Sequence, residues 1–97
     1  DLTGADLSFS TLTRADLTGA LLSNTNFIDA DLSGADLSYA ILTDANLTDA
    51  RLTNARLTYS NLNYSNLSDA KLTGADLTDA KLENINLTGA NLTYITT

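Results

Sequence analysis

The chain has 97 residues, of which 43% are hydrophobic and 18% charged, and twelve acidic residues against five basic ones give a formal net charge of −7. This length suffices for one domain. Because Cys and His are absent, disulfides, thiol or imidazole catalysis and Cys/His zinc sites are excluded. The acidic balance disfavours nucleic acid as a ligand and favours a partner that carries positive charge.

Membrane and export signals are missing from the composition as well. No apolar run approaches the ~18 residues that cross a bilayer, and no signal-peptide core is present. We therefore expect a cytoplasmic protein that has no membrane contact. The residue types and their spacing also suggest no cofactor.

A repeat with a period of five runs along the whole chain. Every fifth position from 2 to 92 holds Leu in eighteen of nineteen cases, and Phe27 is the exception. The positions two residues before these hold Ala thirteen times and Ser three times, and the residue in between is Asp or Asn in twelve of twenty cases. We predict that the Leu column is the core. Its members are Leu2, Leu7, Leu12, Leu17, Leu22, Phe27, Leu32, Leu37, Leu42, Leu47, Leu52, Leu57, Leu62, Leu67, Leu72, Leu77, Leu82, Leu87 and Leu92.

The period of five excludes both regular secondary structures. A five-residue step along an α-helix rotates successive Leu residues by about 140°, which spreads them around the axis. On a straight strand the same step puts successive Leu on opposite faces. Within one unit, however, Ala and Leu are two apart and share a face, and the next two residues have turn chemistry. Each unit is then a short side plus a corner, and four right-angled corners place residue n beneath residue n+20.

The unit Ala-(Asp/Asn)-Leu-(Thr/Ser)-x resembles the pentapeptide repeat proteins, whose consensus is Ala-(Asp/Asn)-Leu-x-x. Eighteen complete units run from Ala5 to Tyr94. The resemblance implies an all-β fold, a right-handed quadrilateral β-helix or solenoid with four pentapeptides per coil. That arrangement makes about five coils, stacked ~4.8 Å apart into a rod roughly 23 Å long.

The domain expectation is a single solenoid over residues 1–97 without terminal caps. The repeat is in phase from Asp1 to Thr97, and the chain starts without Met. An open coil is an exposed β edge. We therefore expect a fragment of a longer protein, or a rod whose ends pack against something. Ile85 and Ile95, at normally small positions, are expected to fill the last coil in part.

No catalytic or metal-binding constellation emerges from the residues, so we predict neither a catalytic nor a metal site. Four Asn-Leu-(Ser/Thr) triplets match the glycosylation acceptor pattern, but the repeat generates them automatically. With no His or Cys, catalysis would depend on carboxylates, and every acidic residue occupies a slot that faces solvent. The sequence therefore predicts a protein that is not an enzyme.

Folding the sequence at period twenty divides the charge among four faces. The first, second and fourth faces carry −2, −4 and −3, whereas the third carries +2. The charged residues in face order are Asp1, Asp44, Lys81, Glu83; Asp6, Asp29, Asp49, Asp69; Arg14, Asp31, Arg51, Lys71; and Asp16, Asp36, Arg56, Asp76, Asp79. The solenoid is therefore expected to be electrostatically sided, with too few cations for nucleic acid.

Two features of the second face have competing interpretations. Asp29, Asp49 and Asp69 would stack at one corner, where like charges repel by about 1 kcal/mol in water. They are either turn residues that bond their own backbone or an acidic strip for a basic partner or a weakly held cation. The neighbouring column, occupied by Asp6, Asn26, Asn46, Asn66 and Asn86, is expected to form a stabilising amide ladder.

A candidate interaction patch is apolar. Leu21 and Ile41 replace Asp/Asn at the outward slot and would be stacked neighbours. Tyr39 and Tyr59 flank them at one corner, and Tyr64 flanks them at the other. A contiguous aromatic and aliphatic cluster of this kind often marks a contact surface, although single exposed apolar residues are unremarkable. Contact with a partner and incidental exposure both remain open.

The sequence favours a non-enzymatic structural or protein–protein interaction module with an unknown protein partner, and it allows self-association through the apolar face or the coil ends. Resemblance to pentapeptide repeat proteins that protect DNA gyrase from quinolones raises a second hypothesis, an acidic DNA mimic. A third hypothesis is an ice-binding face, for which the column in question is Thr13, Ser33, Thr53, Thr73 and Thr93.

Overall fold

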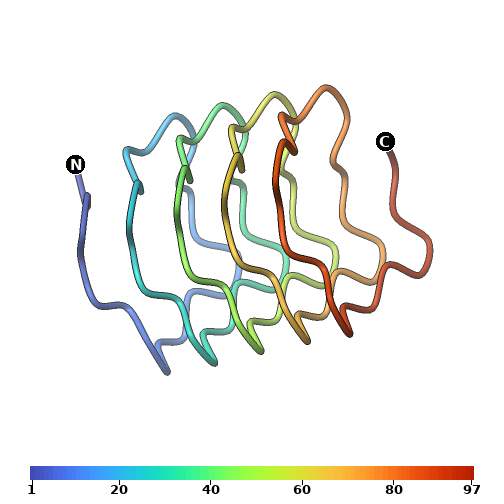
Figure 1. The fold of residues 1–97 in the computed structure, drawn as a ribbon, viewed down its shortest axis with the longest axis horizontal. Helices are drawn as coiled ribbons and strands as arrows, with labels where there is room; N and C mark the ends of the chain where they lie inside the picture. The colour runs from blue at the N-terminus through green and yellow to red at the C-terminus, as the bar shows by residue number, and fades with distance from the viewer.

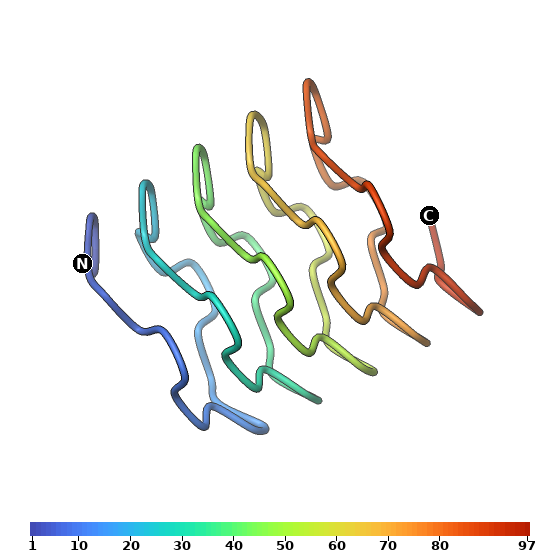
Figure 2. The ribbon, with the colours of Figure 1, turned by 60° about the horizontal axis from the view of Figure 1, so that its bottom comes forward.

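A computed structural model describes all residues from Asp1 to Thr97, and it is a stack of square coils (Figure 1). The chain contains no helix and no strand longer than one residue. Fifteen isolated parallel β-bridges instead join residues twenty apart, from Asp6 with Asn26 to Asp76 with Thr96. The expected register of n over n+20 is therefore confirmed throughout. Figure 2 shows the coils nested one behind the next, with the two chain ends at opposite ends of the stack.

Each pentapeptide repeats the same backbone hydrogen bonds. The Leu42 N–H donates to Asn61 O at 2.7 Å in the next coil, and the Ile41 N–H donates to Ala20 O at 2.9 Å in the preceding coil. Within the coil, the Ala45 N–H donates to Leu42 O at 3.0 Å and closes the corner. Inter-coil bonds thus run in both directions along the stack and hold each coil to its neighbours.

All nineteen corners bend through a residue with positive φ. Five of these residues are Gly and fourteen are not, and the non-Gly φ values lie between 54° and 62°. Positive φ at the third residue of the turn alone is the pattern of a type II turn. Asn and Asp tolerate this conformation, but Phe9, Arg14 and the Tyr residues adopt it at a cost of about 1 kcal/mol each. The inter-coil hydrogen bonds on both sides of each corner hold these residues there.

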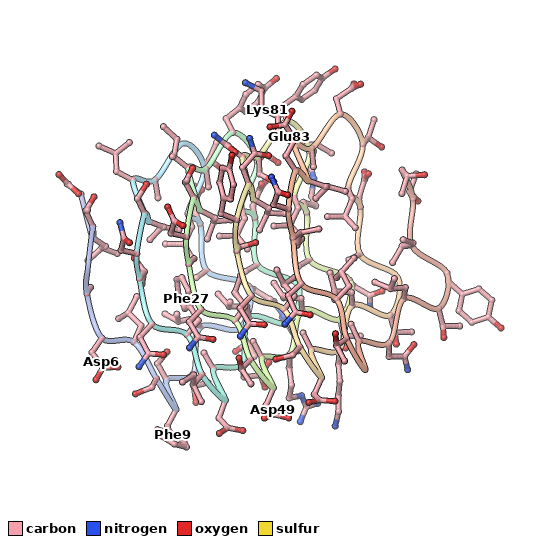
Figure 3. All side chains as sticks on the ribbon, viewed as in Figure 1. Asp6, Phe9, Phe27, Asp49, Lys81 and Glu83 are labelled. Atoms are coloured by element: carbon pink, nitrogen blue, oxygen red, sulfur yellow. The ribbon has the colours of Figure 1, made fainter.

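The interior is filled by the Leu and Ala columns of the middle coils. Phe27 and the Leu residues from Leu22 to Leu77 are buried, as are the Ala residues between them. In Figure 3 the Phe27 label lies inside the stack, among the backbones of the coils. Ser60 and Ser65 replace Ala without leaving an unpaired group, because their hydroxyls donate to the Leu57 and Leu62 carbonyls at 2.7 and 2.6 Å.

The prediction that all nineteen Leu-column residues form the core is wrong at the ends. Leu2 is 39% exposed. The other leucines of the outer coils are only partly buried, because an inward side chain is covered by the coils on both sides and an outer coil has one neighbour. These partly buried residues, which still pack against the core, are Leu7, Leu12, Leu17, Leu82, Leu87 and Leu92. Ile85 and Ile95 lie against the core in the same way.

The molecule is almost as wide as it is long. Its principal extents are 30 × 26 × 24 Å and its radius of gyration is 11.2 Å. The coils are tilted to the long axis (Figure 2), which is why the longest extent exceeds the stacking height expected from the repeat number. No helix of the structure has the length and apolar character needed to cross a membrane.

Candidate functional site

The outward Asp and Asn residues are primarily turn residues. In all twelve cases the side-chain Oδ1 accepts a hydrogen bond from the backbone N–H two residues later, at 2.9 to 3.2 Å. This is the Asx-turn geometry. The twelve residues are Asp1, Asp6, Asp16, Asn26, Asp31, Asp36, Asn46, Asn61, Asn66, Asp76, Asn86 and Asn91.

The same hydrogen bonds lower the pKa of several carboxyl groups. The Ser8 hydroxyl and then the Ser8 amide lower the pKa of Asp6, and the Thr78 hydroxyl and amide do the same for Asp76. Asp16 has a lowered pKa because of the hydroxyl and amide of Thr18. These side chains are therefore charged at neutral pH while they are engaged with the backbone.

The predicted amide ladder is only partly formed. Asn26 Nδ2 donates to Asp6 Oδ1 at 3.2 Å, and Asn86 Nδ2 donates to Asn66 Oδ1 at 3.0 Å. In the middle of the column, however, Asn66 Nδ2 turns to Thr48 Oγ1 at 3.0 Å, and the chain of amides is interrupted. The expected ladder is therefore present at the two ends of the column and broken in the middle, because the Thr48 hydroxyl takes the Nδ2 donor of Asn66.

The acidic strip lies at a corner of the stack, on the same edge as Phe9 (Figure 3, which labels Phe9 and Asp49). Asp29, Asp49 and Asp69 all have positive φ, between 55° and 58°. Their carboxylates make neither an Asx bond nor an ion pair, so the corner Asp residues act through their tolerance of this backbone conformation. No group of three acidic residues in the chain is arranged to hold a metal ion.

The apolar patch is exposed and partly organised by stacking. Leu21 and Ile41 are bridge partners and remain 43% and 39% exposed. Tyr39 and Tyr59 stack with ring centroids 5.1 Å apart and an interplanar angle of 7°. Tyr64 is 56% exposed at the next corner of the coil. The structure thus places the stacked tyrosines at one corner, Leu21 and Ile41 at the outward slot two residues after that corner position, and Tyr64 at the next corner.

Two surface residues were missed in the sequence. Phe9 is 74% exposed beside the acidic strip, and its place in the same corner column, twenty residues before Asp29, could have revealed it. Asp79 ends the column of Tyr39 and Tyr59, and its hydrogen bond with the Tyr59 hydroxyl raises the pKa of that tyrosine. Counting in steps of twenty from Tyr59 would have found this contact.

The third and fourth faces each carry one ion pair. Arg51 Nε lies 4.0 Å from Asp31 Oδ2, and on the fourth face Arg56 Nη1 lies 3.6 Å from Asp36 Oδ2. Both pairs are largely exposed, so each contributes about 1 kcal/mol or less. Lys71 stacks on Arg51 in the same column and makes no ion pair. The surface as a whole has no pocket, so any ligand would be held on an open face.

The geometry defines a class of protein: a four-sided β-helical solenoid in which each five-residue unit contributes one side and one corner. Eight copies of the pattern described as Pentapeptide repeats match residues 1–38, 30–69, 40–79 and 70–94. The chain belongs to the pentapeptide repeat family. A comparison with curated protein sequences gave no match.

Solved structures of the family share the fold. A pentapeptide repeat protein from the thylakoid lumen of Arabidopsis thaliana is 37% identical, with a TM-score of 0.78 over 98% of this chain and 63% of that one. A form of QnrB1, a plasmid-mediated fluoroquinolone resistance protein, is 28% identical, with a TM-score of 0.91 over 97% of this chain and 49% of that one. HetL of Nostoc sp. strain PCC 7120, involved in heterocyst differentiation regulation, is 33% identical, with a TM-score of 0.65 over 99% and 59%.

These similarities confirm the expected right-handed quadrilateral β-helix with four pentapeptides per coil. The chain spans between about half and two-thirds of the length of these three proteins.

Proposed function

We propose that the chain is a non-enzymatic protein–protein interaction module that binds its partner through the patch of Leu21, Ile41, Tyr39, Tyr59 and Tyr64. The observation that carries this proposal is a cluster of exposed apolar side chains on a surface that has no pocket. Within the cluster, the Tyr39 ring stacks on Tyr59, and Leu21 lies beside its bridge partner Ile41. Clustered aromatic and aliphatic side chains of this kind are typical of contact surfaces.

Leu21 and Ile41 lack a backbone hydrogen bond that Asp or Asn would form at their positions, and this loss supports a role in binding. Leu21 and Ile41 occupy outward positions where Asp or Asn would form an Asx bond to the backbone, as twelve residues elsewhere do. They forgo that bond, and because they point outward they add little to the core. Neither the fold nor the interior therefore explains an aliphatic pair at this place, whereas a partner that covers it does.

A matched pair of variants tests the proposal. Ile41→Asp puts a charge into the patch, and Asn91→Asp puts the same charge on the third face, where Asp preserves the Asx bond. Proteins captured by the wild type are identified, purified and measured for affinity against both variants. We expect Ile41→Asp to abolish binding and Asn91→Asp to leave it unchanged. Equal affinities for both variants would contradict the proposal.

The same variants test self-association. If a second copy is the partner, sedimentation will show the wild type and Asn91→Asp as dimers and Ile41→Asp as a monomer. If all three are monomeric, a second copy is eliminated as the occupant of the patch. A cytoplasmic location and the absence of enzymatic activity belong to this proposal. Reproducible turnover of a substrate that is lost on substitution of surface carboxylates would refute the latter.

A second candidate function is mimicry of DNA. It is favoured by the net charges of −4 and −3 on the second and fourth faces and by the similarity to the fluoroquinolone resistance protein QnrB1 over nearly all of this chain. On this hypothesis the acidic faces occupy the DNA-binding surface of gyrase. A supercoiling assay with micromolar protein, with and without a fluoroquinolone, decides it, and an unchanged assay eliminates the candidate.

A further inference from the structure

The apolar patch is adjoined by one carboxylate, that of Asp44. Asp44 is exposed at the corner three residues after Ile41, in the same coil. Its N–H donates to Asn63 O at 3.1 Å, so this corner lies directly against the corner of the next coil, which Tyr64 forms. Asp44 is therefore next to an exposed aliphatic side chain along the chain and to an exposed ring along the stack.

The side chain of a corner residue leans toward the next coil. A Cβ added to a corner glycine would meet the corner side chain of the preceding coil in three places: Arg14 over Gly34, Asn54 over Gly74 and Asp69 over Gly89. Tyr39 likewise stacks on Tyr59, one coil farther along. The same lean takes the carboxylate of Asp44 toward Tyr64, which keeps it at the edge of the patch.

The fold does not require a charge at this corner. Asn24 and Asn84 occupy the same column and adopt φ values of 58° and 54°, against 58° for Asp44. The two ion pairs of the chain involve Asp31 and Asp36, and the Asp44 carboxylate accepts no hydrogen bond. An amide at position 44 would therefore satisfy the turn equally well, and the negative charge is left without a structural role.

The chain supplies no basic side chain on either side of this corner. The second face has no Lys or Arg in any coil, and the first face has only Lys81, two coils beyond Ile41 in the same column. A partner that covers the patch must therefore bring a cation to Asp44 or remove an unpaired carboxylate from water, which costs free energy.

We propose that Asp44 pairs with a basic side chain of the partner protein, on a segment that also places an aliphatic side chain against Leu21 and Ile41. The inference rests on the proposed function, because it concerns the partner of the same patch. Opposite charges at the edge of an apolar contact fix the register of docking and suppress acidic competitors. An exposed pair of this kind adds little affinity by itself, so the apolar contact is needed as well.

The test is an amide NMR titration of the full chain with short capped peptides. Each is a Gly/Ser peptide that contains leucine and, two residues later, a variable residue, because residues i and i+2 of an extended segment point to the same side. The variable residue is arginine, glutamate or citrulline, which is nearly isosteric with arginine and neutral. We expect saturable shifts at Ile41, Asp44 and Tyr64 with the arginine peptide, weaker binding of the citrulline peptide and the weakest binding of the glutamate peptide. Added salt should reduce these differences.

A matched pair of variants locates the charge. Asp44→Asn removes the carboxylate and introduces a residue that the same column already holds at positive φ. Asp49→Asn removes the same charge at the next corner of the coil, where φ is 57° and the residue is also exposed. Asp44→Asn should raise the Kd of the arginine peptide about two- to fivefold and leave that of the citrulline peptide unchanged. Asp49→Asn should leave both values unchanged, although it changes the net charge equally.

The outcomes separate this inference from the proposed function. The pairing is overturned by the absence of a saturable shift at the patch with the arginine peptide, by equal Kd values for arginine and citrulline, or by equal losses of affinity in the two variants. If the pairing fails while Ile41→Asp still abolishes partner binding, the interaction patch stands without it. If the arginine peptide binds at Asp44 but Ile41→Asp leaves the partner's affinity unchanged, the basic contact stands and the proposed patch is wrong.

Discussion

Leu47 and Leu7 occupy the same interior column, and truncating each to Ala measures how the stack distributes its stability. Leu47 is 1% exposed, with a coil on either side, whereas Leu7 is only partly buried. Leu→Ala removes three carbon groups, each worth about 0.8 kcal/mol when buried, or about 2.4 kcal/mol in total. A cavity term adds to this wherever the surroundings cannot collapse.

Collapse is prevented around Leu47 by the hydrogen bonds between coils. The Leu47 N–H donates to Asn66 O at 2.6 Å, and the Phe27 N–H donates to Asn46 O at 2.7 Å, so the backbones above and below are fixed. We therefore expect Leu47→Ala to lower the free energy of unfolding by about 3 to 4 kcal/mol. Leu7→Ala should lower it by about 1 to 2 kcal/mol, because less surface was buried.

Urea unfolding followed by circular dichroism measures both values. Since neighbouring coils alone contact one another, Leu7→Ala is expected to fray the first coil, while Leu47→Ala weakens the whole stack. Amide exchange should then show lost protection confined to the first coil in Leu7→Ala and spread over all coils in Leu47→Ala. Losses at the two positions that agree within about 0.5 kcal/mol would refute this reasoning.

Three further predictions concern polar contacts. Hydrogen bonds in the folded chain lower the carboxyl pKa of Asp6 and Asp76. The ionised carboxylates therefore contribute their full share of stability above about pH 4, and this contribution is lost as the pH falls through the pKa values of the folded state. Thermal melts of the double Asp→Asn variant should therefore lose less Tm between neutral and acid pH than the wild type, and an equal loss would contradict this. Asn66→Ala removes three hydrogen bonds and should cost about 1 to 2 kcal/mol, whereas Asn61→Ala removes one and should cost about half as much, measured by urea unfolding. Asp79→Asn should lower the pKa of Tyr59 toward its ordinary value in an ultraviolet titration, because Asp79 is what raises it; an unchanged titration would exclude the contact.

The architecture could be predicted from the sequence because the repeat is strict. A period of five is incompatible with a helix or a flat sheet, so the corner, the register of twenty and the inward Leu column follow from residue spacing. The same counting placed Leu21 beside Ile41 and Tyr39 beside Tyr59, which the structure shows as bridge partners and a stacked pair. These neighbours follow from the register of twenty residues alone, so they can be predicted without knowledge of side-chain conformation.

The roles of individual polar residues could not be predicted in this way. Asp is found both at the outward slot, where it accepts a backbone hydrogen bond, and at the corner, where it supplies positive φ, and composition does not distinguish these roles. The left-handed conformation of Phe9 and Arg14 contradicts their local preference, and contacts between coils impose it. Likewise, the break in the amide column depends on where the Thr48 hydroxyl lies.

The sequence by itself therefore determined which residues share a column, which side chains point inward or outward, and how the charge is divided among the four faces. A strict five-residue period is sufficient for this, because it assigns every residue a fixed position within its coil. Only the tertiary structure decided which of those neighbours interact. Leu2 is 39% exposed although it belongs to the Leu column, and Tyr39 and Tyr59 stack with ring centroids 5.1 Å apart. Such contacts depend on the orientation of each side chain and on whether a neighbouring coil covers it. Both are fixed only when the coils stack in the folded chain.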